Sequence, residues 1–122
     1  MNFYPIVSAA ENTAELTSEY KGAREIGKIR IGDSYLFCRN GLKTYYIPYS
    51  DVHRCFRRVL EVPVRNACIG GDFSIENIVV CGEGDVELLQ VQLPGAKAAK
   101  ITYEELKTRI PHAKFGKPGS DA

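Results

Sequence analysis

Apolar and polar positions alternate along residues 27–52, and turn-forming residues interrupt the alternation at short intervals. Ile29 and Ile31 flank a charged residue, which is the two-residue period of a half-buried strand. Asn40-Gly41 lies between two apolar runs, and this dipeptide favours the positive φ angles of a tight type I′ hairpin turn. The segment therefore predicts three short antiparallel strands joined as a meander.

The last of these strands belongs to an aromatic-rich region and is expected at an edge of the sheet. Residues 44–47 run into Pro48, which cannot donate to a neighbouring strand and so marks a strand end or an edge. The aromatic residues of this region are Tyr35, Phe37, Tyr45, Tyr46 and Tyr49. Tyrosine is favoured in protein interfaces, but it also has a high strand propensity. Two roles follow for residues 44–49: an edge open to strand addition by a partner, or ordinary strand packing.

Helical spacing precedes the meander. Five positions share one face of a helix over residues 6–20: Ile6, Ala9, Thr13, Leu16 and Tyr20. Ser8 with Glu11 matches a capping box, and Gly22 suits the end of a helix. The sequence therefore predicts an amphipathic helix over residues 6–20, in front of the sheet.

A second helix is predicted near the C-terminus. Its apolar stripe consists of Ala99, Tyr103, Leu106 and Ile110. Thr102 with Glu105 forms another capping box, so the helix begins either at Ala96 or at Thr102. Pro111 ends it, and residues 112–122 are expected to be a mobile tail.

The segment between the meander and the last helix completes the sheet. Residues 52–64 predict a strand with a bend or bulge near Arg57-Arg58. Two further strands are predicted at residues 73–81 and 86–93, because both segments are rich in apolar residues and are bounded by turn signals.

These elements predict an α+β, mainly β fold. The expected architecture is a strongly bent antiparallel sheet, or a partly open barrel, of six or seven strands. The C-terminal helix would cover one open end of it, and the additional helix would precede it. The expected organisation is an N-terminal helical extension at residues 1–22, one domain at 23–111, and a flexible tail at 112–122.

Three segments together suggest a family resemblance: Gly27-Lys28-Ile29-Arg30-Ile31, Tyr35-Leu36-Phe37 and Ile47-Pro48-Tyr49-Ser50-Asp51-Val52. With the helix that follows the last strand, they resemble the pleckstrin-homology-like superfold, in particular small bacterial domains of that class. The resemblance covers residues 23–111 and implies a helix-capped, barrel-like sheet. This superfold hosts lipid, peptide and protein binders, so the resemblance implies binding without naming a ligand.

Composition and charge narrow the function classes. The chain has 122 residues, of which 25% are charged, and its formal net charge is +1. Dedicated nucleic-acid binders are usually strongly basic, so nucleic acid is not an expected partner. No run approaches the roughly 20 apolar residues that span a bilayer. No basic and apolar leader opens the sequence, so we expect a cytoplasmic protein.

The cysteines are expected to be buried, inert thiols. No two of the four cysteines, Cys38, Cys55, Cys68 and Cys81, form a CxxC pair. The alternative is a disulfide framework, and the reducing compartment expected for this protein argues against it. We therefore expect no metal and no cofactor.

His53 and Cys55, with Asp51 nearby, are the weak candidate for catalysis. On a strand, His53 and Cys55 share a face at about 7 Å, which is awkward for a Cys–His dyad. A packed cysteine beside a surface histidine is the favoured interpretation, and we do not expect an enzyme.

A basic surface is the second candidate site. Its residues are Lys28, Arg30, Arg39 and Lys43 from neighbouring strands, and Arg54, Arg57 and Arg58 from the strand that follows. The planar guanidinium group suits phosphate and carboxylate, although charged outward faces are commonly just solvated. The short acidic turn at residues 32–34 argues against phosphoinositide binding.

The sequence thus favours a non-enzymatic binding or scaffold module that acts through protein contacts or self-association. Its candidate residues are Tyr45, Tyr46 and Tyr49. The alternative is a binder of an anionic small ligand or lipid headgroup that uses the basic residues, above all Arg54, Arg57 and Arg58. Contact with a membrane surface is not favoured.

Overall fold

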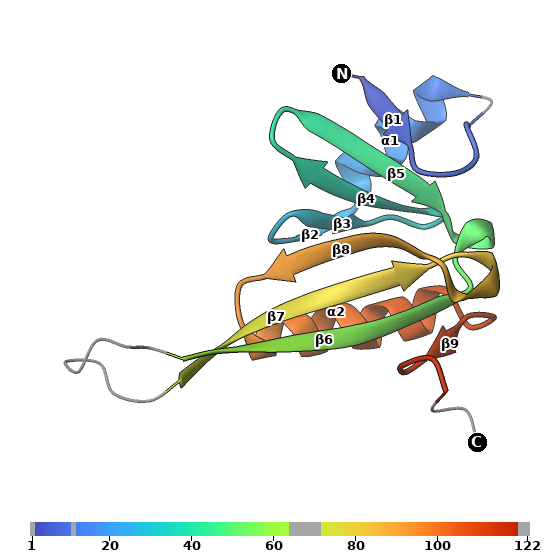
Figure 1. The fold of residues 1–122 in the computed structure, drawn as a ribbon. Coiled ribbons are helices and arrows are strands. Elements are labelled where there is room, and N and C mark those ends of the chain that lie inside the picture. Colours follow the sequence, from blue (N-terminus) through green and yellow to red (C-terminus); the bar gives the residue numbers. More distant parts are fainter. Residues whose placement is uncertain (1, 11, 64–71, 120–122) are drawn as a thin grey trace.

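The computed structural model describes residues 2–10, 12–63 and 72–119. Two α-helices and nine strands lie in these ranges (Figure 1). In chain order they are β1 (Phe3–Pro5), α1 (Thr13–Gly22), β2 (Arg24–Ile26), β3 (Ile29–Ile31), β4 (Tyr35–Asn40), β5 (Lys43–Pro48), β6 (Arg54–Pro63), β7 (Asp72–Cys81), β8 (Glu87–Leu93), α2 (Ala96–Arg109) and β9 (Lys114–Phe115). Short 3-10 turns at Tyr49–Asp51 and Glu83–Asp85 precede β6 and β8.

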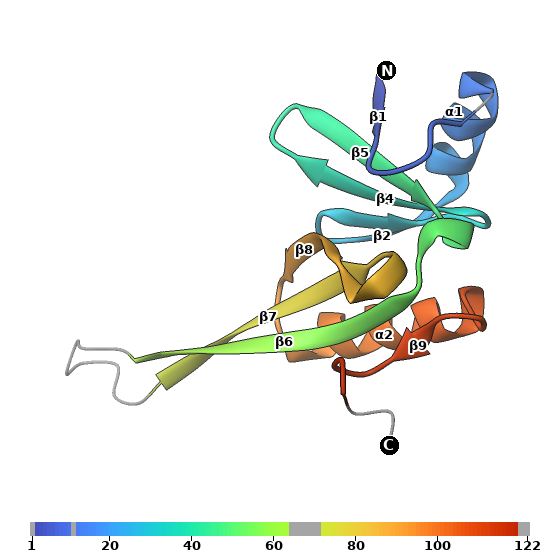
Figure 2. The same cartoon turned by 45° about the vertical axis from the view of Figure 1, so that its right-hand side comes forward.

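The strands form two open sheets, and no ladder joins the sheets within the described ranges. Sheet A has the order β1-β5-β4-β3-β2, and sheet B has the order β8-β7-β6-β9. Figure 2 shows the two sheets one above the other, with α1 beside sheet A and α2 beside sheet B. The expected α+β, mainly β class with a helix at each end is confirmed. The expected single bent sheet is corrected, because the strands divide between two sheets.

One apolar core joins both sheets to α2. Leu106 and Ile110 of the predicted helical stripe are fully buried in it, beside Ile47 of sheet A and Ile78 of sheet B. Ion pairs of Arg109 and Arg24 also connect α2 to sheet A. The prediction that the last helix covers the sheet is therefore confirmed.

The helix itself begins earlier than its capping box. Because α2 starts at Ala96, Thr102 lies inside it, fully buried, with its hydroxyl donating to the carbonyl of Ala98 at 2.8 Å. Glu105 faces Arg109 at 3.3 Å rather than capping the helix. Of the two predicted starting points, Ala96 is confirmed and Thr102 is wrong.

The N-terminal helix is shorter than predicted. Its N-cap is Asn12, whose side-chain oxygen accepts hydrogen bonds from the backbone amides of Ala14 and Glu15. The amide of Ser8 instead donates to the Asp51 carboxylate, so Ser8 does not cap a helix. Phe3–Pro5 form β1, which pairs in parallel with β5. The predicted helix over residues 6–20 is corrected to Thr13–Gly22.

The predicted meander is confirmed as β3, β4 and β5, which pair in antiparallel fashion. Its second turn differs from the type I′ expectation, because Asn40 pairs with Lys43 and the turn residues are Gly41 and Leu42. Only Gly41 of these has a positive φ, +65°, which is the feature of a type II′ turn.

The edge prediction for residues 44–49 is wrong. β5 pairs with β4 on one side and with β1 on the other, so its backbone is hydrogen-bonded along both edges. The edges of sheet A are β1 and β2. Pro48 still ends the strand, as its missing N–H predicts.

The strand over residues 52–64 is more regular than predicted. β6 pairs with β7 in one continuous register from Arg54 to Pro63, so the bulge expected near Arg57-Arg58 is absent from it. The register shift lies on the other side of β7, between Val80 and Cys81. Gly70-Gly71 predict a turn beyond β6, and both residues lie outside the described ranges.

Part of the expected mobile tail is a strand. Lys114 and Phe115 form β9, which pairs in parallel with β6, and Phe115 packs edge-on against Tyr103 of α2. Arg54, only 1% exposed, holds this segment by donating to the Gly116 carbonyl at 2.9 Å. Within the expected tail, Lys114 and Phe115 are thus paired and packed, the flexibility of residues 112–122 stays a prediction, and residues 120–122 lie outside the described ranges. The remaining division, at residues 22 and 111, stays a prediction.

No α-helix in the described ranges is both long and apolar enough to cross a bilayer. The cytoplasmic location stays a prediction.

Candidate functional site

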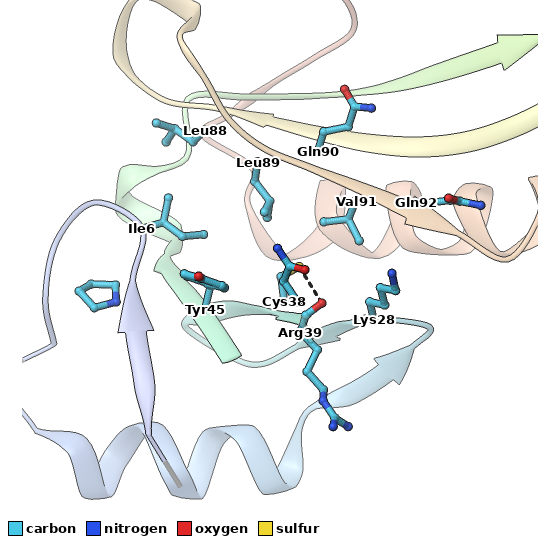
Figure 3. Close-up of a pocket in the computed structure, with 12 residues that line it drawn as sticks. Ile6, Lys28, Cys38, Arg39, Tyr45, Leu88, Leu89, Gln90, Val91 and Gln92 are labelled. Carbon is cyan, nitrogen blue, oxygen red and sulfur yellow. Dashed lines mark hydrogen bonds between the residues drawn. The ribbon is translucent and has the colours of Figure 1, made fainter. Parts of the chain in front are cut away.

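A groove of about 450 Å³ separates β8 of sheet B from the facing strands of sheet A (Figure 3). Residues 88–92 of β8 form one wall, and Cys38 and Tyr45 of β4 and β5 lie opposite. Ile6 stands at one end, and Lys28 stands at the other. A groove of this volume is in the range of ligand-binding clefts.

The β8 wall is the free edge of a sheet. β8 is the terminal strand of sheet B, and β7 is its one pairing partner among the described strands. In an antiparallel edge strand, alternate residues direct both N–H and C=O away from the ladder. The wall therefore offers unpaired backbone donors and acceptors to the groove.

This edge differs from the other three described edges in length and in chemistry. β1, β2 and β9 have three, three and two residues, and they carry Pro5, the charged residues of β2 and Lys114 respectively. β8 has seven residues, and its stretch from Leu88 to Leu93 contains no charge and no proline. Sheet edges are usually protected against pairing with another chain by a short edge strand, by lysine or by proline. The β8 edge has none of these three protections.

Apolar side chains form the floor of the groove, and polar groups make up most of its exposed lining. Leu89 and Val91 point from β8 toward sheet A, where Cys38 and Tyr45 face them (Figure 3). Gln90 alternates to the opposite face of sheet B, where its side-chain oxygen accepts from Arg58 at 2.7 Å. The groove thus combines apolar positions spaced two residues apart with an open strand edge.

Lys28 supplies the charge of the groove. It lies in the turn before β3, is exposed, and extends toward β8 (Figure 3). Its ammonium is near enough to the Cys38 thiol to oppose the rise in that thiol's pKa that burial causes. The residues lining the groove include no aspartate or glutamate, and Lys28 has no ion pair within the described part of the chain.

The side chain of Arg39 borders the groove but does not charge it. β4 alternates, so Cys38 faces the groove while the Arg39 guanidinium points away toward α1 (Figure 3). Of the predicted site residues, the structure therefore brings Lys28 and Tyr45 together at one groove, with the backbone of Arg39 beside them.

The three arginines of β6 do not share a face. Arg54 and Arg58 lie on one side of sheet B, and Arg57 lies on the other, where it pairs with the buried Glu76 at 2.8 Å. Arg54 and Arg58 bind carboxylates as well, those of Asp85 at 2.8 Å and Glu87 at 2.7 Å. Each arginine of the predicted basic strand is thus engaged with an acid of the same chain.

The Arg58 pair lies over an apolar patch. Its guanidinium carbon is 5.3 Å from the centre of the Phe56 ring, and the hydrogen bond with Arg58 lowers the pKa of Glu87. Phe56 forms a small buried cluster with Val79 and Cys81 on this outer face. Arg58 therefore serves as a cover for that cluster.

Other predicted residues have structural roles. Arg30 pairs with Glu25 at 2.7 Å and lies over the Tyr20 ring at 4.2 Å, on the α1 side of sheet A. Tyr46 is 3% exposed, and its hydroxyl accepts a hydrogen bond from the backbone amide of Ala10 at 2.8 Å. Tyr49 is buried, donates to the Gly32 carbonyl at 2.6 Å, and has its pKa raised by that burial.

His53 and Cys55 do not form a reactive pair. His53 is exposed, whereas Cys55 is fully buried, and this burial raises the pKa of its thiol to about 12. A thiol with that pKa is protonated near neutral pH and is a poor nucleophile. Cys38 and Cys81 are also buried free thiols, and Cys68 lies outside the described residues.

The site residues that sequence reasoning missed are those of β8. The sequence predicts residues 86–93 only as an apolar-rich strand, and its run without charge from Leu88 to Leu93 is the signal that could have marked an unusual edge. The run could not be assigned to an edge because strand order depends on pairing between distant segments. A second missed residue is His112, whose Nε2 lies 2.9 Å from the Tyr49 carbonyl and fixes the end of α2 to the turn before β6.

Within residues 2–10, 12–63 and 72–119, no three metal-binding side chains gather into a cluster. The chemistry available at the groove is therefore recognition by backbone hydrogen bonds, apolar contact and one positive charge. Comparison with known proteins gives no closer guide: no family description, no curated protein and no solved structure matches this chain.

Proposed function

We propose that this protein is a non-enzymatic binding module that takes an extended segment of a partner protein along the free edge of β8. The observation that carries the proposal is the unprotected seven-residue edge facing an open groove. In strand addition, backbone hydrogen bonds supply affinity, and pockets for alternate side chains supply selectivity. The groove has both features.

The pleckstrin-homology-like architecture is part of this proposal. Four antiparallel strands, β2 to β5, are followed by three more, β6 to β8, and then by a covering helix. This order supports the resemblance that the sequence suggests. β1 and β9 depart from the minimal pattern, because each adds a parallel pairing at the side of a sheet.

The position of the groove favours a single chain over a second folded copy. Gly27 and Pro94 bring the turn before β3 close to the end of β8, where a Cβ added to Gly27 would lie 3.1 Å from the proline ring. Residues of β4 and β5 line the space beside the β8 edge, and this contact closes one end of it. One extended strand fits into such a space more readily than a whole sheet of another molecule.

The alternative, an anionic ligand on the β6 arginines, has no specific observation in its favour. Arg54, Arg57 and Arg58 face two different sides of the sheet and are each bound to a carboxylate. An incoming anion would have to displace these internal partners.

The proposal is tested by panning a phage-displayed library of random peptides against the protein. We expect peptides to be recovered whose affinity falls at least about tenfold for Asn40→Trp, since Asn40 is exposed, lines the groove and lies on the same face of β4 as Cys38. The matched control is Lys100→Trp, on an exposed part of α2. Both variants should keep the wild-type melting temperature.

Two results would count against the binding function. One is a panning experiment that recovers no peptide above background. The other is a set of peptides that bind Asn40→Trp as tightly as they bind the wild type.

A further inference from the structure

We infer that the groove selects an extended peptide in which an acidic side chain is followed or preceded, at two-residue intervals, by apolar side chains. This inference rests on the proposed binding function and specifies its partner. It follows from three observations: the spacing along β8, the place of Lys28, and the lack of acidic residues around the groove.

The spacing sets the apolar part of the motif. A strand added to β8 places its side chains in line with those of β8, alternately on the two faces. The peptide side chains in line with Leu89 and Val91 would enter the groove and face Cys38 and Tyr45 across it (Figure 3). The side chains between them would face solvent. Two apolar residues separated by one polar residue therefore match the interior.

The positive charge of Lys28 determines the third position of the peptide motif. Lys28 stands near Val91 and Gln92, at the end of the groove away from Ile6 (Figure 3). Its ammonium faces no acid in the groove lining, so a partner carboxylate there would complete an ion pair that the chain itself leaves open. Lys28 also lines a neighbouring hollow with Leu93, two residues beyond Val91, so the acid belongs on the same face of the peptide as the apolar residues.

The order of the motif reports the orientation of the peptide. Lys28 lies beside the C-terminal half of β8. A peptide antiparallel to β8 would therefore place its acid before its apolar residues, and a parallel peptide would place it after them. Either order satisfies the inference, because the groove chemistry is the same.

The test repeats the panning with Lys28→Glu beside the wild type. We expect the wild-type pool to be enriched in aspartate or glutamate two residues from an apolar pair, and the Lys28→Glu pool to be enriched in lysine or arginine there. A synthetic peptide from the wild-type pool should bind Lys28→Glu about tenfold more weakly, and exchange of its acid for lysine should restore the affinity. The control, Lys21→Glu, reverses an exposed charge outside the groove and should leave both pools unchanged.

The outcomes separate this inference from the function on which it rests. Pools that are sensitive to Asn40→Trp but have the same charge pattern for wild type and Lys28→Glu would overturn the inference alone. Pools that are insensitive to Asn40→Trp would overturn the binding function as well. Displacement of the bound peptide by decanoate, with no charge pattern in the pools, would point instead to a small carboxylate ligand and overturn the peptide assignment.

Discussion

Replacement of Leu106 by alanine is expected to lower the free energy of unfolding by about 2–5 kcal/mol. Leu106 has no exposed surface and lies in the core that joins both sheets to α2. The truncation removes buried methyl groups and leaves a cavity, because the two sheets and the helix hold the surrounding side chains in place. Urea denaturation followed by circular dichroism measures the change.

The matched control is Leu42→Ala. Leu42 is 101% exposed in the turn between β4 and β5, so the same chemical change there should alter stability by no more than about 0.5 kcal/mol. Equal effects at the two leucines would contradict the assignment of α2 as the element that closes the core.

A second large effect is expected from Arg54→Met. Arg54 is 1% exposed and donates to the Asp85 carboxylate at 2.8 Å and to the Gly116 carbonyl at 2.9 Å. Methionine keeps an apolar stem but has no donor, so we expect a loss of about 2–3 kcal/mol. The expected loss in the free energy of unfolding is smaller than for a fully buried ion pair, because the Asp85 side chain is 42% exposed.

The same substitution should release β9 from β6. Trypsin cleavage after Lys114 is therefore expected to become faster in Arg54→Met, while the rest of the fold stays resistant. Arg39→Met is the control, since Arg39 is exposed and has no ion pair in the described part of the chain. An unchanged rate of cleavage in Arg54→Met would show that Arg54 does not anchor the C-terminal segment.

Local patterns predicted most of the strands because alternation and turn residues act over short distances. The isoleucines of β3 and the turn at Gly41 belong to two consecutive hairpins, β3-β4 and β4-β5, whose strands are neighbours in sequence. The apolar stripe of α2 was predictable for the same reason, with Leu106 and Ile110 both fully buried. These are the parts of the fold in which sequence neighbours are also neighbours in space.

The errors lie where distant segments decide the outcome. β5 was expected at an edge, but β1, some forty residues earlier, pairs with it. Arg54 was expected on a solvated basic face, but it binds a carbonyl 62 residues away. At the N-terminus, Ser8 and Asn12 are both residue types that cap helices well. In the structure Ser8 contacts the distant Asp51, and the helix is capped by Asn12 instead.

The candidate groove was only partly predictable. Lys28 and Tyr45 were chosen for charge and aromatic character, and both line it. In the sequence, Lys28 and Arg30 alternate with Ile29 and Ile31, a pattern that would place both basic residues on one face of a strand. Because β3 begins at Ile29, Lys28 instead belongs to the turn before the strand and extends toward β8. The β8 wall could not be foreseen, since a strand becomes an edge only when the whole sheet has formed.

Residue-resolved amide hydrogen exchange of β8, with and without a peptide from the wild-type pool, tests the central claim most directly. We expect alternate amides within residues 88–92 to exchange rapidly in the free protein, because they face the open groove, and to become protected when the peptide binds. Protection of all these amides in the free protein would contradict the account. So would peptide-induced protection that appears along β1, β2 or β9 and leaves β8 unchanged.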